Sequence, residues 1–186
     1  YNASNGRVEF TNGEMVNNNG LDGGGIYNKN GVVVMNGGTM YPVYKGIQNE
    51  NNGTVEINGG TIVTTKYEPV INKGTGDVVI NNGLLKVIET CYAKTINNAS
   101  TASITINGGI FSARGADGII NFGNKGTLNI NGGKFINTSH STMFNPTNRV
   151  VDLPENTYLK VSYTKSGDSH VYIGELDTAG DYELTT

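Results

Sequence analysis

Short apolar pieces alternate with glycine- and asparagine-rich turns along most of the chain. Six segments share one pattern: a small residue, any residue, an apolar residue, any residue, a second apolar residue, and then Asn or Thr. These segments are 6–11, 31–36, 53–58, 76–81, 102–107 and 126–131, and their starts are 25, 22, 23, 26 and 24 residues apart. Apolar positions two residues apart place their side chains on one face of a β-strand. Each repeat is therefore predicted to open with a short strand.

Two further apolar pieces follow within every repeat. The first is marked by a large apolar residue four positions after the Asn or Thr: Met15, Met40, Ile62, Leu85, Phe111 and Phe135. The second ends in another Asn, 13 to 17 residues after that Asn or Thr: Asn28, Asn49, Asn72, Asn97, Asn121 and Asn145. All of these pieces are too short for a helix, so each repeat is predicted to hold at least three strands.

The repeats predict an all-β fold, a single-stranded right-handed parallel β-helix of about six to seven coils. One coil per repeat lets each strand pair in parallel with the equivalent strand one coil on, about 4.8 Å away. Equivalent residues then stack, and two interior columns are expected: Val8, Val33, Val55, Val78, Ile104 and Leu128, and Phe10, Met35, Ile57, Ile80, Ile106 and Ile130. Coils of 22–26 residues are expected over 1–149.

The last part of the chain, 150–186, departs from the repeat. Val151–Pro154 is interpreted as a degenerate last coil, with Tyr158 in the column of Phe135. Residues 159–163 and 170–173 flank a Ser-Gly-Asp-Ser turn and predict a capping hairpin. This part holds 2 basic and 7 acidic residues, against 11 and 9 before it. It is expected to cap the rod or to lead into another domain.

Asparagine columns are expected beside the turns, because an amide both donates and accepts hydrogen bonds and can bond to its copy one coil away. One predicted ladder holds Asn36, Asn58, Asn81, Asn107 and Asn131, and the other holds Asn28, Asn49, Asn72, Asn97, Asn121 and Asn145. Their role is interpreted as structural and not as ligand binding.

The Gly-x-Val-x-Ile-Asn-Gly-Gly pattern over about residues 6–149 resembles right-handed parallel β-helix proteins of the pectin-lyase-like type. The resemblance is greatest to the Asn-Gly-Gly repeats of large surface proteins of Gram-positive bacteria. It implies an extracellular protein on the bacterial cell surface. The family includes polysaccharide lyases, hydrolases and adhesins, so the resemblance leaves the activity open.

Composition removes several classes of protein. Gly (27) and Asn (27) fill 54 of 186 positions, which argues against a helical bundle, and no apolar run is long enough to span a membrane. One Cys excludes a disulfide scaffold, and a net charge of -3 disfavours a nucleic-acid partner. Cys91, His140 and His170 have no metal-ligand spacing, so no metal and no cofactor is expected.

Catalytic groups are sparse. A glycosidase needs two carboxylates about 5 to 10 Å apart. Glu9 and Glu56 occupy one outward column two coils apart, without supporting residues. Acids on the variable turn (Glu68, Glu89 and Asp117) have unequal offsets, and a lyase base would have to be Lys94 or Arg114. The sequence leaves catalysis undecided and favours a role without it.

One side of the coils carries aromatic and basic residues. The position five residues before the second Asn column is occupied in four coils by Tyr44, Tyr67, Tyr92 and His140. Four basic residues lie within two positions of this tyrosine-containing column: Lys45, Lys66, Lys94 and Arg114. These eight residues are named the tyrosine face. A flat row of rings with donors alongside suits a sugar ring or a partner protein. The structural alternative is a ring ladder that keeps the coils in register.

The expected function is therefore a non-enzymatic, stiff adhesin or spacer that contacts glycan or a host surface protein through the tyrosine face. The chain is expected to be a monomeric fragment of a larger multidomain protein. The alternatives are a fragment of a polysaccharide lyase or glycoside hydrolase, and a dedicated carbohydrate-binding module.

Overall fold

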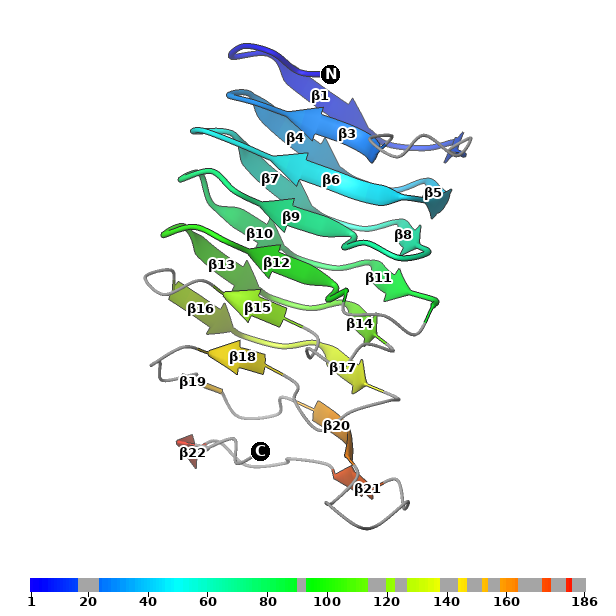
Figure 1. Ribbon diagram of the computed structural model, residues 1–186, viewed down its shortest axis with the longest axis vertical. Coiled ribbons are helices and arrows are strands. Elements are labelled where there is room, and N and C mark those ends of the chain that lie inside the picture. Colours follow the sequence, from blue (N-terminus) through cyan, green and yellow to red (C-terminus); the bar gives the residue numbers. More distant parts are fainter. Residues whose placement is uncertain are drawn as a thin grey trace.

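The computed structural model describes residues 1–16, 24–89, 93–113, 120–122, 127–137, 144–146, 152–153, 158–163, 172–174 and 180–181. Every regular element over these residues is a β-strand. Equivalent strands of successive coils lie one below another along the longest axis of the molecule, with the N-terminus at one end (Figure 1). The all-β class and the parallel β-helix are confirmed.

The strands form three sheets. The first sheet contains β1 (Arg7–Phe10), β4 (Val32–Met35), β7 (Thr54–Ile57), β10 (Val78–Ile80), β13 (Ser103–Ile106), β16 (Thr127–Ile130), β19 (Asp152–Leu153) and β22 (Gly180–Asp181). The second contains β2 (Glu14–Met15), β5 (Thr39–Val43), β8 (Thr61–Thr64), β11 (Leu84–Val87), β14 (Ile110–Ala113), β17 (Lys134–Asn137), β20 (Tyr158–Tyr163) and β21 (Tyr172–Gly174). The third contains β3 (Gly24–Asn28), β6 (Lys45–Asn49), β9 (Val70–Asn72), β12 (Ile96–Asn98), β15 (Ile120–Phe122) and β18 (Phe144–Pro146).

The interior of the first sheet follows the predicted columns. Val33 pairs with Val55, Val55 with Val78 and Val78 with Ile104, all in parallel register and all at most 1% exposed. Met35, Ile57, Ile80, Ile106 and Ile130 form the second buried column. Because identical chemistry stacks at every coil, the core is continuous along the axis.

The second sheet adds a third interior column, whose members are Met15, Met40, Ile62, Leu85, Phe111 and Phe135. The last two rings stack with centroids 4.9 Å apart and planes 11° apart. The turns that lead into this sheet use glycine at positive φ, as at Gly60 (φ 91°), where a side chain would be strained.

An asparagine ladder lies inside the third sheet. Each amide nitrogen donates to the side-chain oxygen in the next coil, over 2.9 Å from Asn2 to Asn28, 2.7 Å to Asn49, 2.9 Å to Asn72 and 3.0 Å to Asn98. Each also donates to a backbone carbonyl of its own turn, as Asn72 does to Gly76 over 3.0 Å. Because these amides are at most 8% exposed, the ladder satisfies polar groups that water does not reach.

The predicted membership of this ladder is wrong in three coils. Asn98, and not Asn97, pairs with Asn72. Asn97 pairs with Ile71, and Asn121 and Asn145 continue the column of Asn97, one residue away from the ladder. A shift of one residue moves a side chain to the opposite face of a strand. The adjacent pair of asparagines in this coil made the pattern ambiguous.

The C-terminal strands change direction. β17 and β20 pair in parallel, and then β20 and β21 pair antiparallel, with Tyr163 opposite Tyr172. The predicted hairpin cap is therefore present. The expected place of Tyr158 is wrong, since Tyr158 pairs with Lys134 and Leu159 occupies the column of Phe135. The predicted Val151–Pro154 segment is described only at Asp152 and Leu153.

Candidate functional site

The outer asparagine ladder lies at the turn between the first and second sheets. Its amides bond in the opposite direction to the inner ladder, toward the N-terminal end: from Asn58 to Asn36 over 2.9 Å, from Asn81 to Asn58 over 2.6 Å, from Asn107 to Asn81 over 2.7 Å and from Asn131 to Asn107 over 2.7 Å. The predicted ladder is confirmed. Since these amides are bonded to one another along the axis, they join each coil to the next.

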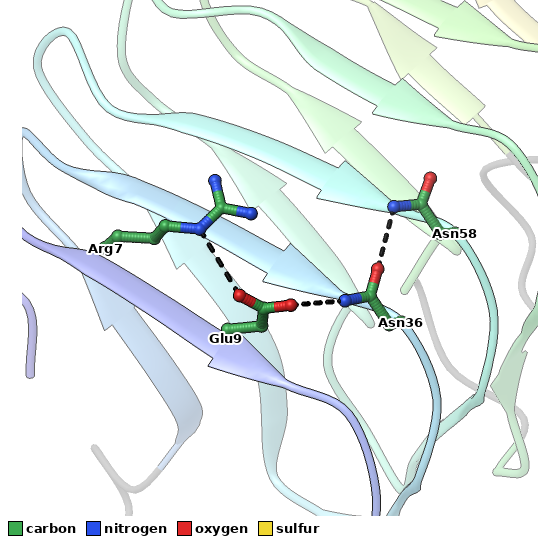
Figure 2. A network of polar contacts seen from close by, with 4 residues as sticks. All are labelled: Arg7, Glu9, Asn36 and Asn58. Carbon is green, nitrogen blue, oxygen red and sulfur yellow. Dashed lines mark hydrogen bonds and ion pairs between the residues drawn. The ribbon is translucent and has the colours of Figure 1, made fainter.

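A carboxylate accepts the last hydrogen bond of this outer ladder. Asn36 donates to Glu9 over 2.7 Å, and the second oxygen of Glu9 accepts a hydrogen bond and ion pair from Arg7 at 3.4 Å (Figure 2). A carboxylate accepts hydrogen bonds without donating, so it suits the end of a ladder whose donors point toward it. Glu9 is therefore engaged in structure at the position where catalysis was considered.

The tyrosine face is partly described, and its rings are not a flat row. The ring centroids of Tyr44 and Tyr67 are 4.4 Å apart with planes tilted by 46°. A tilt removes the repulsion between facing π-systems that parallel rings at the spacing of the coils would have. Tyr44 is half-buried and Tyr67 is 38% exposed, so a partner reaches mainly the ring of Tyr67.

The basic residues of the face have partners within the chain. The Lys45 ammonium lies 5.5 Å from the centroid of the Tyr67 ring, within the range of a cation–π contact. Lys66 and Glu89 form an exposed ion pair at 3.8 Å, and Lys94 is half-buried. The Lys45 contact holds one cation of the face close to a ring.

Three members of the face, Tyr92, Arg114 and His140, lie outside the described residues. The third tyrosine was placed by counting back from Asn97. Counting five residues back from the true ladder member, Asn98, reaches Ala93, which is 4% exposed. The predicted three-ring column therefore has only two described tyrosines.

One carboxylate of the variable turn is buried. Glu68 follows Tyr67 directly, is 8% exposed and accepts a hydrogen bond of 3.3 Å from Asn97. Its backbone carbonyl accepts from the N–H of Gly46 in the coil before it. Glu68 is thus enclosed and hydrogen-bonded, whereas Glu89 is exposed and ion-paired with Lys66, and Asp117 lies outside the described residues.

The outward carboxylates Glu9 and Glu56 lie two coils apart, as the sequence spacing predicts. Val34 stands between Glu9 and Glu56 in the paired register. Strand spacing places the two backbones about 9.6 Å apart, within the range of an inverting pair. Glu9, however, is bound by Arg7 and Asn36.

A polar cluster that the sequence analysis missed lies on the outer face of the third sheet. Tyr27 donates a hydrogen bond to Glu50, which also accepts 2.9 Å from Gln48, and the ring of Tyr1 stacks on Tyr27 at 5.1 Å. The bond to Glu50, then burial and the carboxylate charge, raises the pKa of Tyr27 to about 12. The same bond lowers the pKa of Glu50. The cluster could have been found by aligning the repeats on Asn28 and Asn49, since this alignment places Tyr27 beside Gln48.

Within the described residues, no group of three His, Cys, Asp or Glu side chains could hold a metal ion. In the same part of the chain, no helix has the length and apolar character needed to cross a membrane. Comparisons of the chain with protein-family models, curated proteins and solved structures find no match.

Proposed function

We propose that this chain is a stiff, non-catalytic segment of a bacterial cell-surface protein, and that its tyrosine face contacts glycan or a host surface protein. The observation that carries the proposal is the Tyr44–Tyr67 pair with Lys45 against it. An aromatic ring beside a cation offers both apolar area and a donor to a sugar or a peptide. The Asn-Gly-Gly repeats supply the resemblance to surface proteins.

Rigidity is the second part of the proposal. Two hydrogen-bonded ladders of opposite direction and a continuous apolar core join each coil to the next. A solenoid of this kind resists bending because many identical bonds join every coil to its neighbours. Such a rod holds a side face at a fixed distance from its point of attachment.

A glycan array tests the contact. The Tyr67→Ala and Lys45→Ala variants should lose at least tenfold in binding, since Tyr67 is the more exposed ring of the pair. Tyr1→Ala is the matched control, because Tyr1 is an exposed tyrosine that stacks elsewhere, on Tyr27. Binding that all three variants retain, or that Tyr1→Ala alone removes, would assign recognition to another surface. An array of host surface proteins tests the second class of partner with the same variants.

The enzymatic alternative needs a separate assay. The chain is incubated with pectins, host glycans and dextrans, and new reducing ends or unsaturated products are measured. We expect none. Turnover that disappears in Glu56→Gln or Glu68→Gln would replace the proposal with a carbohydrate-active enzyme.

A further inference from the structure

Six Asn-Gly pairs lie at the turns between the first and second sheets, and they occur in two different settings. In the outer ladder, Asn36, Asn58, Asn107 and Asn131 each precede a glycine. At the equivalent turns of two other coils, Asn12 precedes Gly13 and Asn82 precedes Gly83. The dipeptide is the same in both settings, so a difference in its chemistry must come from the structure.

The exposed turn asparagines hold their amide against the next backbone nitrogen. The N–H of Gly13 donates to the Asn12 side-chain oxygen over 2.8 Å, and the N–H of Gly83 donates to that of Asn82 over 2.8 Å. Among the Asn-Gly pairs of the described residues, this contact occurs at these two. Because the oxygen is bonded to the amide carbon, the nitrogen is held next to the carbon that it would attack.

The ladder asparagines hold their amides elsewhere. Asn107 donates to Asn81 and accepts from Asn131, both over 2.7 Å. Asn36 is bonded on both sides as well, to Glu9 and Asn58, and the N–H of Gly37 donates to the Phe10 carbonyl over 3.4 Å. Asn36 and Asn107 are exposed, and so are Asn12 and Asn82, so burial does not separate these four residues into the two sets.

We infer that Asn12 and Asn82 are sites of spontaneous deamidation and that the ladder protects the Asn-Gly pairs of Asn36, Asn58, Asn107 and Asn131. The glycine nitrogen loses its proton to solvent base and bonds to the side-chain carbon. The side-chain nitrogen takes up a proton and leaves as ammonia, which produces a succinimide. One water molecule then opens this ring to aspartate or isoaspartate, without any oxidant or enzyme.

Ladder bonds slow this reaction, because an amide must leave its two partners before its carbon can meet the glycine nitrogen. The loss of two hydrogen bonds predicts rates lower by about ten- to a hundredfold. A negative charge would consequently accumulate at the turns of Asn12 and Asn82 while the ladders remain intact.

The test is peptide mass spectrometry of the folded chain after incubation at neutral pH in water enriched in heavy oxygen. The isotope marks deamidation that occurs during the incubation. We expect Asn12 and Asn82 to convert at least tenfold faster than Asn36 and Asn107, and the four rates to converge in denaturant. Equal rates in the folded chain would overturn the inference, as would a difference that persists in denaturant.

A variant pair isolates the ladder bond. Asn131→Ala removes the donor to Asn107 and should speed deamidation at Asn107, whereas Asn129→Ala, an exposed neighbour outside the ladder, should not. Circular dichroism confirms that both variants remain folded, and the comparison within the unmodified chain stands without them. An unchanged rate at Asn107 in folded Asn131→Ala would show that the ladder does not protect it.

Discussion

Replacing one asparagine of the inner ladder should destabilise the fold far more than replacing one of the outer ladder. The perturbation is Asn49→Ala, at a fully buried side chain. Asn49 accepts from Asn28 over 2.7 Å, donates to Asn72 over 2.9 Å and also donates to the Gly53 carbonyl. The matched variant is Asn107→Ala, at an exposed side chain with a ladder bond of 2.7 Å on each side.

The two variants should lose different amounts of stability because water reaches one site and not the other. Three bonds at about 1 kcal/mol each, with buried partners left unsatisfied, predict a loss of about 3 kcal/mol for Asn49→Ala. At Asn107, water replaces the missing partner, and the expected loss is below about 1 kcal/mol. Both changes truncate an asparagine to the same methyl group, so the two variants differ in the surroundings of the lost amide.

Urea unfolding followed by circular dichroism measures both variants against the parent chain. The slope of the transition should stay constant, so that the midpoint reports stability alone. Equal losses for the two variants would refute the reasoning that desolvation, and not the ladder bond itself, sets the cost. A larger loss at Asn107 than at Asn49 would refute it more strongly.

Three other changes test separate features. Tyr27→Phe should raise the pKa of Glu50, because it removes the hydrogen bond that lowers this pKa. In the parent, the lowered pKa of Glu50 stabilises the fold above the unfolded pKa of about 4.3, and this stabilisation is lost as the pH falls through the folded pKa. The difference in melting temperature between parent and variant should therefore become smaller in acid. Gly60→Ala should cost at least about 2 kcal/mol, measured by urea unfolding, because φ is 91° and the new methyl would lie 2.7 Å from the Gly38 carbonyl oxygen; a loss no larger than that of an exposed substitution would contradict it. Glu9→Ala should lower stability by about 0.5 kcal/mol and Glu9→Gln by less, because only Gln keeps an acceptor for the outer ladder; identical losses would remove the ladder end as the cause.

The core columns could be predicted from the sequence because their positions depend only on the repeat. Val33, Val55 and Val78 recur at one place in each repeat, and stacked coils bring identical positions together. The outer ladder was reachable for the same reason, since the turn after the first strand is short and nearly constant in length.

The inner ladder was reachable only in part. The stretch between the second and third strands varies in length, so its residues cannot be aligned by counting. Asn97 and Asn98 both fit the pattern, and the pairing of Ile96 with Val70 decides between them. The same shift of one residue changes the residue that counting assigns to the ring column, from Tyr92 to Ala93.

By itself, the sequence determined the number of strands in a repeat, the faces that point inward and the turns that need glycine. These follow from a two-residue period repeated at nearly constant spacing, and every coil restates them. Only the tertiary structure decided which asparagine enters the interior, how the rings of Tyr44 and Tyr67 tilt, and that Glu9 and Glu50 accept hydrogen bonds from neighbouring coils. These depend on the offset between one coil and the next, which is set by packing and hydrogen bonding across the stack and is not written in any single repeat.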